Sequence, residues 1–386
     1  MKYVILRCED GGPPAGRTAG LLEGAKTSHL HQLAQAGAAG LIRPQARAGR
    51  GDALDRFRLH RALFGLERSD AGAAAGRCYA DAAGVTLEPG ETAWGCELVT
   101  QRDGRIVDPT AGNIPTKESG PLLQALDDEL SSETRRWEPG AGPHHVFVTR
   151  DPSLAAGAKG AVASPELLVG RAWRRQLPSG GTGEALLALI ERSSAVLDAH
   201  PINRVRVDLG ENPANMVWLW GAGAAEPLRP FAERTGLSGS VVSNSFLLRG
   251  FARSLGLGWR EGPASFEEPP LQRLWESLGP ALEQQDWLYV HVKVTSGDPV
   301  QRLCAMERLD QLLLKPLTER LPRLGPWRLL AAVDDRTLRA VPFIAIGTGL
   351  PRQPAASLAA DAFAQSPLAF PDGDGAFAWF TQGPTR

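Results

Sequence analysis

The sequence predicts an α/β protein, with a mostly parallel sheet that has helices on both faces and a smaller inserted α+β domain. A short apolar strand, Lys2–Leu6, stands at the N-terminus, and such a run is typical of a buried central strand. The C-terminal half alternates between apolar strands and helical patterns, as expected for helices packed on a parallel sheet. A strand–turn–strand pattern at 92–108 indicates a separate domain in the middle of the chain.

Composition and charge exclude several classes of function. The 386 residues carry a net charge of −1, so we expect neither a nucleic acid nor an anionic membrane as partner. No apolar run is long enough to cross a bilayer, and no signal sequence precedes the first strand, so we expect a cytoplasmic location. The four cysteines are scattered, which indicates neither a zinc knuckle nor a disulfide framework.

The first strand leads into an acidic turn, Glu9-Asp10-Gly11-Gly12. In open α/β sheets the chemistry lies beyond the carboxyl ends of the strands, and Asp10 stands at that edge. Its carboxylate can ligate a metal or orient a metal-bound phosphate. It can also cap the next segment as an ordinary turn aspartate, and this stretch alone favours the turn.

The inserted domain is predicted over 74–183, so that the core consists of 1–73 and 184–386. The small-residue stretch 70–84 is a plausible crossing between domains. A hairpin, a helix from Thr116 to Leu130 and a further strand at 145–149 follow it.

The core sheet is expected to contain six strands, because each is a short apolar run followed by a helical pattern or a turn. They begin near Tyr3, Met216, Ser240, Trp287, Leu329 and Val341.

Several motifs resemble one known family when they are taken in this order. The most specific are His200-Pro201-Ile202-Asn203-Arg204, 212–223 (Asn-Pro-Ala-Asn and Trp-Leu-Trp-Gly-Ala-Gly) and 289–293 (Tyr-Val-His-Val-Lys). The chain resembles the archaeal-type 2,3-bisphosphoglycerate-independent phosphoglycerate mutases, from Met1 to about Gly347. This family belongs to the alkaline phosphatase-like metalloenzyme superfamily. The resemblance implies a phosphatase-like core interrupted by a smaller domain, and an isomerase of glycolysis.

The resemblance also implies a mechanism with two divalent metals, usually manganese, and a serine that carries the phosphoryl group. Two metals polarise the phosphoryl oxygens and lower the pKa of the serine. In this chain the nucleophile's position falls near Gly51, which has no hydroxyl group. The family's first-strand aspartate corresponds to Asp10, or to Glu9 if no gap is opened.

The remaining metal ligands of the family are also altered. After the position of Lys293 the family has an aspartate and then a histidine, and Asp298 is the carboxylate of this chain that lies nearest to them. Asp334-Asp335 stands where the family has an adjacent Asp-His pair. No histidine follows His291, and His29, His31 and His60 lie too early to match. We therefore expect no tightly bound manganese or zinc, because no imidazole stands at the ancestral ligand positions.

Coordinated losses at one site favour a pseudoenzyme, a non-catalytic binding or scaffolding relative without a cofactor. Whether the chain is an enzyme stays open at this point. The alternative is a divergent mutase or phosphotransferase that uses magnesium or manganese. Its site would consist of carboxylates alone, namely Asp10, Asp298, Asp334 and Asp335.

Four residues are candidates for binding a phosphorylated small molecule: Arg204, Lys293, His200 and Asn203. Arginine offers a two-pronged fork to phosphate or carboxylate, and lysine supplies a point charge. Packing, with the cations paired to Asp10 or Asp334, also explains these residues and is the favoured interpretation. If the cleft binds no ligand, we expect a protein partner on the surface.

Overall fold

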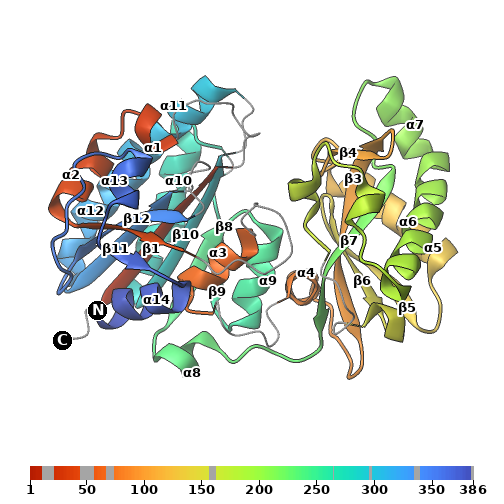
Figure 1. The fold of residues 1–386 in the computed structure, drawn as a ribbon, viewed down its shortest axis with the longest axis horizontal. Helices are drawn as coiled ribbons and strands as arrows, with labels where there is room; N and C mark the ends of the chain where they lie inside the picture. Colours follow the sequence, from red (N-terminus) through yellow and green to blue (C-terminus); the bar gives the residue numbers. More distant parts are fainter. Residues whose placement is uncertain are drawn as a thin grey trace. The chain divides into compact units, whose positions relative to one another are not determined.

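The computed structural model describes residues 1–10, 21–43, 56–66, 74–155, 162–263, 265–294, 298–333 and 340–383. The chain forms two compact units, and most of their elements are labelled in Figure 1. The core unit contains Met1–Ser69, Pro230–Asn244 and Gly256–Arg386. The second unit contains Asp70–Arg229 and Ser245–Leu255.

The core unit is built on an eight-stranded sheet in the order β13-β2-β12-β11-β1-β10-β8-β9. Strand β1 pairs in parallel with both β10 and β11, and β8 and β9 continue the parallel part. Strand β12 is antiparallel to β11 and to β2. The predicted class, a mostly parallel sheet in an α/β fold, is confirmed. The strands are β1 (Lys2–Asp10), β2 (Ala38–Ile42), β8 (Gly239–Ser243), β9 (Gly258–Glu261), β10 (Trp287–Val294), β11 (Trp327–Val333), β12 (Val341–Gly347) and β13 (Ala369–Phe370).

Helices cover both faces of this sheet (Figure 1). Helices α2, α10, α11 and α12 bury leucine-rich stripes against one face, together with Leu6 and Val290 from the strands. On the other face Trp287 contacts Phe64, which follows α3, and Phe231 of α8. The helices of this unit are α1 (Leu21–Gly24), α2 (Ser28–Ala36), α3 (Arg56–Leu63), α8 (Phe231–Thr235), α10 (Glu268–Gln284), α11 (Pro299–Leu309), α12 (Lys315–Arg320), α13 (Ala360–Ala364) and α14 (Gly373–Gln382).

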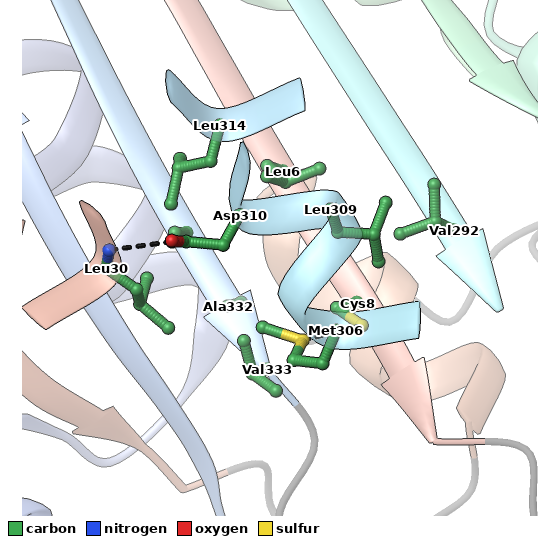
Figure 2. A pocket seen from close by; sticks show the side chains of 11 residues that line it. Leu6, Cys8, Leu30, Val292, Met306, Leu309, Asp310, Leu314, Ala332 and Val333 are labelled. Atoms are coloured by element: carbon green, nitrogen blue, oxygen red, sulfur yellow. Dashed lines mark hydrogen bonds between the residues drawn. The ribbon is translucent and has the colours of Figure 1, made fainter. Parts of the chain in front are cut away.

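A small apolar pocket lies on the leucine-rich face, between β1, β10, β11 and α11 (Figure 2). Its one acidic lining residue, Asp310, is 1% exposed. The Asp310 carboxylate accepts hydrogen bonds from the backbone N–H groups of His29, at 3.0 Å, and Leu30, at 2.8 Å. These are the donors that a helix start leaves without an intrahelical partner. Thr27 stands at the N-cap of α2 but makes no capping bond with its side chain, so Asp310 caps the helix from a distant part of the chain.

The second unit is an antiparallel five-stranded sheet with helices. Strand β3 pairs with β4, β6 and β7, and β6 pairs with β5. The predicted hairpin turn is present, with positive φ at Asp103 and Gly104, as tight hairpins require. The elements are β3 (Thr92–Arg102), β4 (Arg105–Asp108), β5 (Arg135–Ala141), β6 (His144–Thr149), β7 (Met216–Ala224), α4 (Ala75–Ala83), α5 (Thr116–Leu130), α6 (Gly181–Ala199), α7 (Pro201–Asp208) and α9 (Phe246–Ser254), with 3-10 turns at Pro152–Leu154, Pro165–Leu168 and Trp173–Gln176.

One strand belongs to a different sheet from the one that the sequence predicted. Strand β7, expected in the core sheet from Met216 onward, pairs with β3 of the second unit instead. Its apolar run is buried by contacts with α4 and α6 as well as by β3. A continuous apolar run indicates burial on both faces but does not say in which sheet. The predicted exit at residue 183 therefore differs from the structure, in which the second unit continues to Arg229 and includes α9.

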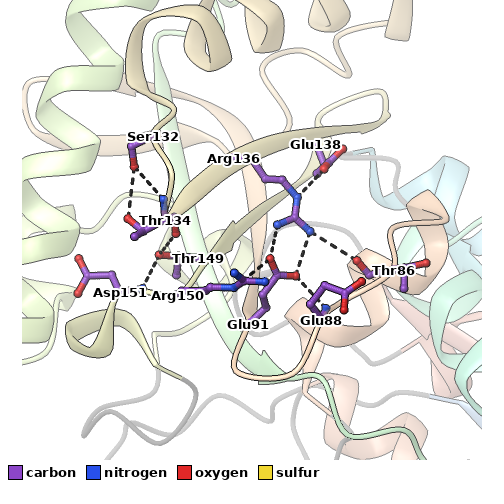
Figure 3. A network of polar contacts seen from close by, with 10 residues as sticks. All are labelled: Thr86, Glu88, Glu91, Ser132, Thr134, Arg136, Glu138, Thr149, Arg150 and Asp151. Carbon is purple, nitrogen blue, oxygen red and sulfur yellow. Dashed lines mark hydrogen bonds and ion pairs between the residues drawn. The ribbon is translucent and has the colours of Figure 1, made fainter.

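An ion-pair network fixes the start of β3 to its neighbours (Figure 3). The Glu91 carboxylate is 5% exposed and accepts hydrogen bonds from two guanidinium nitrogens of Arg136 on β5. Arg150, after β6, lies 3.6 Å from the same carboxylate. The hydrogen bonds from Arg136 hold the pKa of Glu91 below its usual value. A two-pronged pair of this kind adds geometric specificity to the sheet edge.

Helices α4 and α9 pack so closely that glycine is required between them. A Cβ on Gly250 would lie 1.6 Å from the backbone oxygen of Cys78. We expect Gly250→Ala to lower the free energy of unfolding by about 3 kcal/mol, the scale of a severe overpacking change. Gly120→Ala, in α5, is the control, because a Cβ there meets no atom within 4 Å; it should be neutral or stabilising by about 0.5–1 kcal/mol. Urea unfolding of both variants measures this, and equal midpoints would contradict it.

Buried His145 should make the protein sensitive to acid. Burial lowers the pKa of His145 to about 3, whereas the unfolded imidazole titrates near about 6.5. As the pH falls below about 6.5, the unfolded state binds a proton that the folded state does not, so stability declines until about pH 3. At about pH 5 we expect His145→Gln to remove about 2 kcal/mol of this acid-induced loss. Unfolding midpoints between about pH 5 and about pH 7.5 check it, and equal slopes for both proteins would contradict it.

Candidate functional site: a buried carboxylate between two imidazoles

Polar side chains occupy alternate positions on one face of β1 and β10. In the parallel register Arg7 is opposite His291, and Glu9 is opposite Lys293. Because side chains alternate between the faces of a sheet, these four residues share one face. Their chain neighbours, Cys8 of β1 and Val290 and Val292 of β10, point into the leucine-rich core on the opposite face. The polar face therefore lies at the carboxyl ends of two central parallel strands, where α/β enzymes place their chemistry.

Glu9, His60 and His291 form a cluster on this face. Helix α3 brings His60 to it. The Glu9 Oε2 atom lies 3.1 Å from His291 Nε2 and 3.5 Å from His60 Nε2. The two imidazole rings are edge to face, with their centroids 4.8 Å apart. All three side chains are at most 4% exposed, so the cluster is withdrawn from bulk water.

Each imidazole is held from behind by a hydroxyl group. His60 Nδ1 lies 2.7 Å from the Tyr289 hydroxyl, and His291 Nδ1 lies 2.8 Å from Ser243 Oγ. Tyr289 is on β10, and Ser243 is the last residue of the neighbouring strand β8. These contacts fix the planes of both rings, so that each Nε2 atom points at Glu9.

Two cations flank the same carboxylate. The fully buried Arg7 has its Nη2 atom 3.9 Å from Glu9 Oε2, and Lys293, whose side chain is 31% exposed, has its Nζ atom 3.8 Å from Glu9 Oε1. An ion pair taken out of water is favourable only when the charges are well matched, and here the carboxylate is matched from both sides.

The protonation states follow from this environment. Burial raises the pKa of Glu9, but hydrogen bonds from His291 and His60 and the charge of Lys293 bring it well below its usual value, so Glu9 is ionised. Burial lowers the pKa of His60, and the Arg7 charge lowers it further; burial also lowers the pKa of His291. Both imidazoles are therefore neutral near pH 7. An ionised carboxylate only accepts, so His291 donates from Nε2 to Glu9 and accepts from Ser243 at Nδ1.

The structure places the predicted metal ligands as follows. Asp298 is exposed and accepts a hydrogen bond from the backbone N–H of Val300 at 2.9 Å, which makes it the N-cap of α11. Asp10 ends β1, and its side chain lies outside the described residues, as do Asp334, Asp335 and Gly51 altogether. Most of the predicted carboxylate-only site therefore lies outside the described residues and stays a prediction. Within the described residues, the Glu9 carboxylate meets two imidazoles.

Three of the predicted ligand-binding residues lie in the second unit. His200 caps α7 by accepting the backbone N–H of Ile202 at Nδ1. Asn203 is buried and bonds backbone groups of Leu197 and Ala214. Both side chains therefore support local packing. Arg204 is exposed on α7. The fourth residue, Lys293, belongs to the core unit and to the Glu9 cluster.

The sequence reasoning missed the two imidazoles. His60 lies too early in the chain to match the family pattern, His291 belongs to a family motif, and no imidazole stands at the ancestral ligand positions. Away from those positions, both rings face Glu9. The signal for the strand residues was present: charged or polar residues at every second position of otherwise apolar strands, Arg7 and Glu9 in one and His291 and Lys293 in the other. For His60 there was no comparable signal.

The fold and this site define an α/β protein with a titratable cluster at the carboxyl edge of its core sheet. A sequence model of the 2,3-bisphosphoglycerate-independent phosphoglycerate mutases matches residues 60–203. The mutase of Methanosarcina acetivorans is 30% identical over 332 residues, which cover 82% of this chain and 81% of the relative. That of Methanosarcina mazei is 30% identical over 334 residues, 83% and 81% of the two chains.

Two solved structures share the fold. The cofactor-independent phosphoglycerate mutase of Thermoplasma acidophilum has a TM-score of 0.58 and 22% identity, with 99% of both chains covered. The PH0037 protein of Pyrococcus horikoshii has a TM-score of 0.67 and 17% identity, covering 100% of this chain and 98% of the other. This chain belongs to the 2,3-bisphosphoglycerate-independent phosphoglycerate mutase family, as its motifs predicted.

Neutralising Glu9 should destabilise the core unit. Glu9→Gln leaves the buried Arg7 without the negative charge that faces it, and breaking one side of a buried ion pair costs about 3–5 kcal/mol. Glu191→Gln is the control, because its ion pair with Arg174 is exposed on both sides and should cost less than about 1 kcal/mol. Equilibrium unfolding in urea separates the two, and a loss below about 1 kcal/mol for Glu9→Gln would show that the pair contributes little.

Proposed function

We propose that this chain binds the kind of phosphorylated acid after which its relatives are named, a phosphoglycerate, without carrying out the mutase reaction. The observation that supports this proposal is the pair of cations at the carboxyl edge of the sheet. Arg7 and Lys293 lie on either side of the Glu9 carboxylate, and Lys293 reaches solvent. A guanidinium and an ammonium group at one edge of the sheet are the groups that bind phosphate and carboxylate.

The absence of the mutase reaction is supported by the nucleophile position. A phosphoryl group that moves between two positions by way of the enzyme needs a side chain to carry it. The resemblance puts Gly51 at that position, and glycine has no atom that can accept a phosphoryl group. Asp298, the nearest carboxylate to another ancestral ligand, is used as a helix cap.

A second candidate is a divergent phosphotransferase with a different serine. Ser243 donates to His291, whose other nitrogen faces Glu9. A hydroxyl, an imidazole and a carboxylate in this order are the arrangement that activates serine nucleophiles. In such an enzyme Ser243 Oγ would attack the phosphoryl phosphorus, the bond to the substrate oxygen would break, and His291 would take the hydroxyl proton. Against it stands the complete burial of Ser243.

Calorimetry with 3-phosphoglycerate and with inorganic phosphate tests the binding proposal. We expect binding by the wild type and a loss of more than about 1 kcal/mol of binding free energy in Lys293→Met, the scale of a charge-assisted hydrogen bond. Lys117→Met, an exposed lysine of α5 in the second unit, should bind like the wild type. Arg204→Ala tests whether this exposed cation takes part. No heat at millimolar ligand would overturn the proposal.

An activity assay separates the two candidates. With either phosphoglycerate as substrate we expect no interconversion. Turnover that Ser243→Ala abolishes, together with phosphate on Ser243 detected by mass spectrometry, would establish the second candidate in place of the first.

A further inference from the structure

We propose that Glu9, His60 and His291 bind one divalent transition metal ion of the zinc class. The potential ligand atoms all lie within 4.8 Å of one another, and two of the three separations, 3.1 and 3.5 Å, join Glu9 Oε2 to the Nε2 atoms. Zinc–nitrogen and zinc–oxygen bonds of about 2.0–2.1 Å in a tetrahedral site place neighbouring ligand atoms about 3.3 Å apart. Both separations from Glu9 are close to this spacing, and the two imidazole ligand atoms, at most 4.8 Å apart, would approach one another when an ion binds.

The hydroxyl groups behind the imidazoles support this assignment. Metal-ligating histidines are held by a hydrogen bond from the other ring nitrogen, which fixes the tautomer and the plane of the ring. Tyr289 and Ser243 occupy these outer positions at 2.7 and 2.8 Å. Both hydroxyl oxygens can accept as well as donate. On metal binding the ring protons would therefore stand on the Nδ1 atoms, facing the hydroxyls, and each Nε2 atom would offer a lone pair to the ion.

The donor set specifies both the kind and the number of ions. Two imidazoles and one carboxylate are the protein ligands of many zinc sites with an open fourth position, and of some iron(II) sites. Manganese and magnesium prefer sites richer in oxygen. The family resemblance implies two metals, but the cluster formed by the described residues supplies three ligands, which fit one ion. The two imidazoles of this cluster do not stand at the family's ligand positions, and they favour zinc over manganese.

The flanking cations set a condition on this site. Lys293 approaches Oε1 of Glu9, while the two imidazoles face Oε2, so ammonium and ion would use different oxygens. Arg7 lies 3.9 Å from Oε2, beyond hydrogen-bond distance, yet its charge opposes a second cation nearby. An anion in the open fourth position would offset this repulsion. Metal and phosphate should therefore bind with positive coupling, each raising the affinity for the other.

Metal analysis of the intact protein tests the site without an activity assay. Protein stripped with a chelator is dialysed against zinc in phosphate-free buffer, and bound metal is measured by mass spectrometry. We expect about one equivalent in the wild type and less than about a tenth of that in His60→Gln and His291→Gln. The control is His144→Gln in the second unit, where a single imidazole nitrogen lies 2.7 Å from the Glu97 carboxylate; it should still bind about one equivalent.

Cobalt substitution keeps the test valid if the variants fold poorly. Wild-type protein loaded with cobalt(II) should show the intense visible absorption of a four-coordinate ion with nitrogen and oxygen ligands. Adding phosphate should raise the zinc affinity at least about threefold, if the coupling exceeds about 0.65 kcal/mol. Two equivalents of metal, no binding at micromolar free zinc, or equal binding by His60→Gln would each overturn the inference. Binding of 3-phosphoglycerate to the metal-free protein is measured separately. A failure of metal binding therefore leaves the proposed function standing, and a failure of phosphoglycerate binding leaves the metal site standing.

Discussion

The pairing of β1 with β10 is the constraint on which the site depends. The parallel register puts Arg7 beside His291 and Glu9 beside Lys293, and a slip of either strand by one residue would turn its two polar side chains toward the leucine-rich core. The ionised Glu9 in turn determines the state of its neighbours. It accepts a hydrogen bond from His291 and faces His60, and its charge offsets those of Arg7 and Lys293. Among the described residues, the buried Glu9 carboxylate thereby joins two cations and two neutral imidazoles in one small volume.

The core sheet was largely predictable from the sequence, and the reason is local. Strands such as Lys2–Asp10 and Trp287–Val294 have an uninterrupted row of apolar residues on one face. The periodicity of the sequence reveals this pattern. Strand β7 was not assignable, because Met216–Ala224 has the same apolar pattern as a core strand and only its pairing with β3 puts it in the second unit. Partner choice is a tertiary property, and no short window of sequence contains it.

The candidate site was predictable only in part, for a related reason. The edge of the sheet was located correctly, since strand ends can be found from sequence. The residues that gather there were not, because His60 comes from a helix and reaches Glu9 across more than fifty residues of chain. The family resemblance directed attention to positions such as Asp298, which caps a helix, and away from side chains that the family pattern does not use. A family motif therefore identified the fold more reliably than it identified the chemistry of this chain.

The order of the strands along the chain has a consequence for synthesis. Strand β1 pairs with β10 and β11, and β2 pairs with β12 and β13, so the first two strands find their partners only in residues 287–370. On the ribosome the N-terminal strands emerge long before these partners exist, whereas the sheet of the second unit is complete once Ala224 has been made. The second unit can therefore assemble first during translation, with the exception of α9, and the core sheet closes last. Until then the apolar face of β1 is exposed to any chaperone or to another nascent chain.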